Sequence, residues 1–273
     1  MLMPTIIAAI ILGLVEGATE FVPVSSTGHL ILAGHALGFV GPRAAAFEII
    51  IQLGAILAVV WLYRRLLFRV VRDGIAVAES RRLIVALFIA FLPAAIVGLL
   101  THHWITAHLF RPPVVIVALI VGGVAILAIE RWRPAPHIEA VPQIDYRTAL
   151  WIGIAQVCSL IPGVSRSGAT IMGALLAGVA RPAAAEFSFL LAIPVMFAAT
   201  GLDLWENRHL LSGSDALMLA VGFVVAFASA LVVVRWLIRF VSHRSFDLFA
   251  WYRIVFGLAL VAVLATGRSW LAK

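Results

Sequence analysis

The sequence predicts an all-α polytopic membrane protein, an inverted-topology repeat with six transmembrane helices plus two re-entrant helix-loop-helix segments. Composition is the first reason, because the 273 residues are 63% hydrophobic and only 12% charged, with a mean hydropathy of +1.11. Soluble domains carry about 25% charged residues. The apolar runs are also long and continuous, whereas a β-barrel needs short alternating strands. No polar block approaches the size of a soluble domain, so residues 1–273 form a single integral membrane domain.

Six segments are long enough to cross a bilayer, which takes about 17–25 residues. Two further apolar regions, 4–38 and 148–178, are interrupted midway by Pro, Gly and Ser clusters, and each half is too short to span. A broken segment is tolerated at membrane depth where its loop is buried in protein or lines a wet cavity, which predicts the two re-entrant pairs. The predicted spans are 47–63, 83–100, 113–129, 184–202, 216–237 and 249–267.

Two halves of the chain match each other at a separation of 140 residues, which predicts a first repeat over 1–134 and a second over 141–273. Three spans per repeat is an odd number, so the second copy is expected to insert upside down. The interrupted segments then enter from opposite sides, and their loops meet near the bilayer midplane. The matches include Gly13 with Gly153, Glu16 with Gln156, Ser25 with Ser165 and Gly28 with Gly168.

Arginines accumulate in the connecting loops 64–82, 130–148 and 235–248, which all fall on one side in this arrangement. Positive residues favour the cytoplasmic side. The formal charge of +7 is therefore interpreted as a determinant of topology and of contact with membrane lipids, and no nucleic acid partner is expected. A further connection, between 83–100 and 113–129, is expected to be a solvated loop that contains His102, His103 and His108.

The first interrupted segment carries two acids, Glu16 and Glu20. Residues four apart share one face of a helix, and two carboxylates so placed do not both ionise readily in a low-dielectric site. A divalent cation held by both would remove this penalty, and oxygen ligands suit Mg²⁺ or Ca²⁺. The alternative is a structural role in which one carboxyl is protonated or hydrogen-bonded. Function is favoured because acids inside a membrane are costly and usually functional.

Hydroxyl groups and an imidazole follow the break in this segment, at Ser25, Ser26, Thr27 and His29. Hydroxyls beside a helix start suit anion binding, because the backbone N–H groups and the helix dipole both favour negative charge there. N-capping is the simpler alternative, but it needs only one hydroxyl. A lone histidine is more often structural, but beside carboxylates and hydroxyls His29 is predicted to act as an acid or base.

The second interrupted segment adds Arg166, the one arginine expected at membrane depth. The planar guanidinium matches phosphate oxygens in a way that lysine does not, and a buried guanidinium needs an anionic partner. The alternative is a salt bridge from Arg166 to Glu16 or Glu20. The two roles are compatible if the salt bridge breaks when a phosphate binds. The neighbours expected to complete a phosphate-binding loop are Ser165, Ser167, Gly168 and Thr170.

Together the two loops suit phosphoryl transfer, in which positioning and charge neutralisation do most of the work. Neither loop has the GxxxxGK[ST] pattern of a P-loop, so nucleotide binding is not expected. Either Ser26 attacks phosphorus with help from His29, or one of these groups activates a water. The predicted catalytic residues are Glu16, Glu20, Ser26, His29 and Arg166.

These motifs resemble those of the undecaprenyl-diphosphate phosphatase family, also called bacitracin resistance protein. Its (E/Q)xxxE element is similar to Glu16–Glu20, its PGxSRSxxT element matches Pro162 to Thr170, and its histidine matches His29. The resemblance implies a hydrolase of the bacterial inner membrane that converts undecaprenyl diphosphate to the monophosphate, recycles the peptidoglycan lipid carrier and confers bacitracin resistance. It also implies dependence on a divalent cation, a site open to the periplasm and a homodimer. A flippase or transporter of polyprenyl phosphate is the rival, since inverted repeats with broken helices are transporter architecture.

Overall fold

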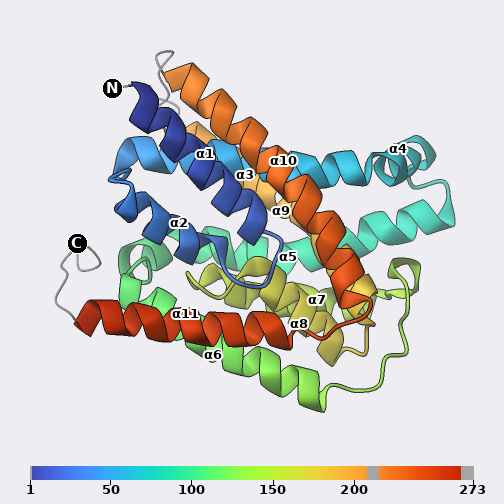
Figure 1. The fold of residues 1–273 in the computed structure, drawn as a ribbon. Helices are drawn as coiled ribbons and strands as arrows, with labels where there is room; N and C mark the ends of the chain where they lie inside the picture. The colour runs from blue at the N-terminus through green and yellow to red at the C-terminus, as the bar shows by residue number, and fades with distance from the viewer. Residues whose placement is uncertain (1, 208–214, 266–273) are drawn as a thin grey trace.

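The computed structural model describes residues 2–207 and 215–265, and these are almost entirely helical (Figure 1). Within the described residues, the one β pairing is an isolated parallel bridge between Ile138 and Val179. The helices of the first half are α1 (Leu2–Thr19), α2 (Ser26–Ala36), α3 (Pro42–Leu62), α4 (Arg64–Asp73), α5 (Ala78–His108) and α6 (Pro112–Trp132). Those of the second half are η1 (Val141–Gln143), α7 (Tyr146–Val157), η2 (Cys158–Leu160), α8 (Arg166–Leu176), α9 (Arg181–Asn207), α10 (Ala216–Val241) and α11 (Asp247–Ala265).

Six of the described helices are long and apolar enough to cross a membrane: α3, α5, α6, α9, α10 and α11. Each coincides with one of the six predicted spans, so the prediction of an all-α, multi-pass membrane protein is confirmed. Residues 266 and 267, the end of the predicted span 249–267, lie outside the described residues.

Two predicted loops are wrong in part, because helices continue beyond the bilayer-length windows. α5 runs to His108, so the three histidines expected in a loop are helical. Nothing between Leu100 and His108 breaks a helix, and the next prolines, which do, come at 112 and 113. The segment 64–82 likewise contains the short helix α4.

α1, the helix that carries both acids, packs along α10, which in turn packs along α3 (Figure 1). Gly17 makes this close approach possible, since a Cβ there would lie 2.5 Å from the Ala226 carbonyl oxygen. Small residues at such interfaces let two helix backbones approach closely. On the other side of the molecule α11 lies along α6 (Figure 1).

Two helix–turn–helix pairs, α1–α2 and α7–α8, carry the predicted site residues. The turn between α1 and α2 lies near the centre of the molecule, and both the start of α1 and the end of α2 lie toward its left edge (Figure 1). α2 and α8 are each 11 residues long. The residues before them, Ser25 and Ser165, have positive φ angles of 70° and 75°. Residues other than glycine rarely adopt this backbone conformation. It costs on the order of 1–3 kcal/mol per residue and is found mainly at functional sites.

Candidate active site

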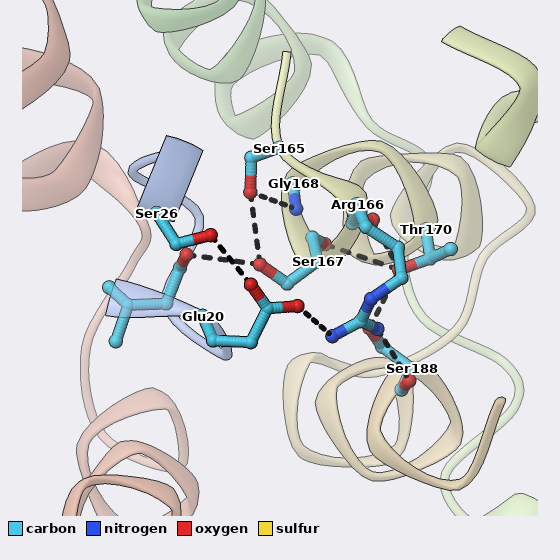
Figure 2. A network of polar contacts seen from close by, with 9 residues as sticks. Glu20, Ser26, Ser165, Arg166, Ser167, Gly168, Thr170 and Ser188 are labelled. Carbon is cyan, nitrogen blue, oxygen red and sulfur yellow. Dashed lines mark hydrogen bonds and ion pairs between the residues drawn. The ribbon is translucent and has the colours of Figure 1, made fainter. Parts of the chain in front are cut away.

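A single carboxylate joins the two turns (Figure 2). Glu20, just after α1, accepts a hydrogen bond of 2.6 Å at its Oε2 from the Ser26 hydroxyl, the first residue of α2. Its Oε1 lies 3.3 Å from Nη2 of Arg166, the first residue of α8. The structure therefore brings together three of the predicted catalytic residues from segments 140 residues apart in the chain.

A chain of hydroxyls ties the start of α8 to the first loop (Figure 2). Ser167 donates a hydrogen bond of 3.0 Å to the Val22 carbonyl oxygen. Because that donation uses the Ser167 proton, the 3.0 Å contact between Ser165 and Ser167 requires Ser165 to be the donor. Ser165 in turn accepts from the Gly168 N–H at 3.1 Å, which caps α8. The predicted phosphate-binding residues Ser167 and Gly168 thus hold the loop in shape.

Arg166 has spare hydrogen-bonding capacity. Its Nη1 donates to the Ser188 carbonyl oxygen at 3.2 Å, while its buried Nε has no partner among the described residues. Thr170 is fully buried and bonds the Ser188 hydroxyl at 2.6 Å and the Arg166 carbonyl at 2.9 Å. Thr170 therefore supports the loop, and the α9 residue Ser188 joins the site without any signal in the sequence motifs. A buried guanidinium N–H without a partner is uncommon and requires an explanation.

Glu16 is 1% exposed, and both its carboxylate oxygens lack a hydrogen-bond partner within the described residues. The Glu16 carboxyl interacts electrostatically with Glu20, Glu48 and Arg166. An ionised carboxylate in such surroundings is costly without compensation, so a cation or a proton must accompany it. No group of three or more His, Cys, Asp or Glu side chains arranged to hold a metal occurs in the described part of the chain. Two carboxylates nonetheless fit Mg²⁺, which is often held by one or two carboxylates with water and substrate phosphates.

The His29 side chain contacts α11. Its Nδ1 lies 2.7 Å from the Ser25 carbonyl oxygen, an acceptor, so Nδ1 carries the proton. In the neutral ring Nε2 then accepts the hydroxyl of Tyr252 at 2.6 Å. The ring also stacks on Phe256, with centroids 4.4 Å apart. Both nitrogens are occupied, so the Ser26–His29 pair, one of the two alternatives from sequence, is not formed, and the Ser26 hydroxyl bonds Glu20.

The remaining first-loop hydroxyls differ in exposure. Ser25 is buried, and its side chain does not cap α2. Thr27 is partly exposed in the first turn of α2. The uncapped start of α2 consequently keeps N–H groups that favour an anion.

One buried arginine was missed by the sequence analysis: Arg253 of α11 is fully buried. The expectation that Arg166 is the one arginine at membrane depth is therefore wrong. A signal was present, because Arg253 lies within the predicted span 249–267, and an ionisable residue within a span is usually functional. Its guanidinium donates hydrogen bonds of 2.9–3.3 Å to the backbone carbonyl oxygens of Pro23, Ala118, Leu119, Gly163 and Val164.

Comparison of the sequence with known proteins identifies its family. The family model of the bacitracin resistance protein BacA matches residues 9–259. The undecaprenyl-diphosphatase of Parvibaculum lavamentivorans is 52% identical, covering 94% of this chain and 96% of its own. That of Nitrosomonas europaea is 52% identical over 96% of both chains, and undecaprenyl-diphosphatase 2 of Rhodospirillum rubrum is 53% identical over 98% of both. This chain belongs to the bacitracin resistance protein BacA family.

Proposed function

We propose that this protein hydrolyses undecaprenyl diphosphate to undecaprenyl monophosphate and phosphate. The substrate is inferred from its relatives, which are named undecaprenyl-diphosphatases. One observation carries the chemistry: Ser26 and Arg166 share the Glu20 carboxylate, at 2.6 Å and 3.3 Å. A potential nucleophile, a proton acceptor and a phosphate-binding cation therefore lie within one hydrogen-bonded group.

In the proposed mechanism the Ser26 oxygen attacks the terminal phosphorus while Glu20 takes the Ser26 proton. The bond from that phosphorus to the bridging oxygen breaks, and Glu20 passes the proton to the departing monophosphate. Water then attacks the phosphoserine, giving a proton to Glu20, which returns it to Ser26 as phosphate leaves. A water activated by Glu20 is the alternative nucleophile.

Arg166 is proposed to bind the transferred phosphate through its unpaired Nε and remaining N–H groups. A guanidinium in a water-poor site stabilises the negative charge that develops there. Ser25 and Thr27 are proposed to add phosphate contacts, and Ser165 to join them by giving up its bond to Ser167 when phosphate binds. In this proposal Ser167, Gly168 and Thr170 do not contact the phosphate directly. Their polar groups hold the second loop in shape.

Glu16 and Glu20 are the residues that would hold a divalent cation, Mg²⁺ or Ca²⁺, and the bound ion would neutralise phosphate charge. The unpartnered oxygens of Glu16 support this assignment. His29, bonded to Tyr252, is proposed to exchange protons at the exposed side of the site.

The location and topology that we propose are those predicted from the sequence. We propose an inner-membrane enzyme of two inverted repeats, 1–134 and 141–273, with its arginine-rich loops in the cytoplasm and its site open to the periplasm. The equal lengths of α2 and α8 and the matching positive φ of Ser25 and Ser165 support the repeat. A homodimer remains a prediction.

The test is phosphate release from undecaprenyl diphosphate by purified protein in detergent micelles. Arg166→Ala is expected to remove nearly all release, and Arg244→Ala, at an exposed arginine, to leave it unchanged. Wild-type turnover by Arg166→Ala would exclude the proposed site. A flippase would release no phosphate in micelles, where no second compartment exists.

A further inference from the structure

Arg253 lies between the two loops of the site and bonds both. Its Nη1 donates to the Pro23 carbonyl oxygen of the first loop at 3.1 Å and to the Val164 carbonyl oxygen of the second at 2.9 Å. Its Nη2 donates to the Gly163 carbonyl oxygen at 2.9 Å. The two remaining bonds reach α6, at Ala118 and Leu119. One side chain on α11 therefore links both turns to α6.

The guanidinium has no donor left for a substrate. A guanidinium carries five N–H groups, and five carbonyl oxygens accept from Arg253. Arg166 differs, because its Nε is unpaired. The two arginines thus have separate tasks: Arg166 keeps an N–H group that can bind phosphate, whereas every N–H group of Arg253 is bonded to the backbone.

Two glycines make room for this arrangement. Gly122 of α6 faces the Arg253 guanidinium so closely that a Cβ would overlap it. Gly163 has a positive φ of 97°, and a Cβ there would lie 2.7 Å from the Val115 carbonyl oxygen of α6. The second loop is therefore pressed against α6 at the point where Arg253 bonds both.

We propose that Arg253 is a positioning residue that fixes the first loop, Val22–Ser26, relative to the second loop, Gly163–Arg166. This rests on the proposed function, in which Ser26 and Arg166 must both reach Glu20. The role predicts a particular kinetic pattern. Small misplacement of reacting groups costs on the order of 100-fold in rate, so losing the link lowers kcat far more than it raises KM.

Arg253→Lys is the first test, since it keeps the positive charge but offers three donors from a single atom, too few to bond both loops and α6. We expect kcat to fall about 10- to 100-fold with KM changed less than about threefold. Arg181→Lys is the matched control. Arg181 also links two helices, through bonds of 2.9 and 2.6 Å to Glu130, but it touches neither loop. We expect this control to lower the thermal midpoint and leave kcat of the folded protein unchanged.

A second pair of variants keeps the arginine itself. Gly122→Ala presses a methyl group against the Arg253 guanidinium, while Gly257→Ala presses one against Ile120 in the same α6–α11 interface. We expect only Gly122→Ala to lower kcat at matched thermal stability.

Two results would overturn the proposal: wild-type kcat in the folded Arg253→Lys protein, or equal loss of kcat in Gly122→Ala and Gly257→Ala. Arg166→Ala, measured in the same assay, separates this inference from the proposed function. If Arg166→Ala is inactive while Arg253→Lys keeps full kcat, only the positioning role fails. If Arg166→Ala is active, the proposed site itself is wrong.

Discussion

Glu20→Gln tests the central carboxylate with the smallest change in shape. The amide oxygen can still accept from Arg166, which lies 3.3 Å from Oε1. The amide nitrogen, however, would face the Ser26 hydroxyl, now 2.6 Å from Oε2, and an amide nitrogen accepts no proton. A positioned general base contributes about 10²- to 10⁴-fold in rate. At 1.36 kcal/mol per tenfold change, this raises the barrier by about 3–5 kcal/mol.

Loss of folding does not explain a decrease of this size. Glu20→Gln also removes the counter-charge of Arg166, whose side chain is 10% exposed. Because the hydrogen bond to the amide oxygen survives, we expect a loss of about 1–2 kcal/mol in stability. A domain stable by about 5–15 kcal/mol remains almost wholly folded after that change.

The assay is phosphate release in micelles, normalised to folded protein by thermal unfolding. Glu139→Gln, at an exposed loop residue, makes the same change of charge away from the site and should match wild type. If Glu20→Gln retained more than a tenth of wild-type kcat, Glu20 would not be the proton acceptor and the mechanism would fail.

Three further outcomes are expected. Ser26→Ala should abolish the phosphoserine trapped by acid quench of a reaction with terminally labelled substrate; trapped label in this variant, or none in wild type, contradicts attack by Ser26. Chelation by EDTA should stop phosphate release, and Glu16→Gln should raise the Mg²⁺ concentration needed for half-maximal activity about 10- to 100-fold, by analogy with altered metal-site partners; an unchanged Mg²⁺ curve would remove Glu16 as a ligand. Ser165→Ala should lower stability by about 1 kcal/mol because it removes the cap of α8, whereas Ser25→Ala, which removes no cap, should be close to neutral; equal thermal midpoints for the two variants contradict this reading.

The six spans were predictable because hydropathy alone decides which segments the bilayer accepts. Helix ends were less predictable: α5 continues to His108, since a helix stops where its backbone is interrupted and not where the lipid ends. α4 lies in a segment that was expected to be a loop. It has 10 residues, none of them buried, so hydropathy over a span-length window could not reveal it.

The participants of the site were predictable, but their pairing was not. Glu20 and Arg166 stand in recognisable motifs, and a buried guanidinium requires an anion. The partner of His29 is Tyr252, 223 residues away in the sequence, and no local pattern places that hydroxyl beside the imidazole. Arg253 was detectable as a charge within an apolar span, yet its partners are backbone carbonyls, which carry no signal in the sequence.

The bonds of Arg253 to carbonyl oxygens have a consequence for which changes the loops tolerate. Every amino acid presents the same main-chain oxygen, so replacing the side chain at Val164 leaves the acceptor in place. An added or deleted residue between Pro23 and Ser26, in contrast, would move the first-loop acceptor out of register with Arg253. We therefore expect these turns to tolerate many amino-acid substitutions as long as their length is unchanged, and to tolerate very few insertions or deletions.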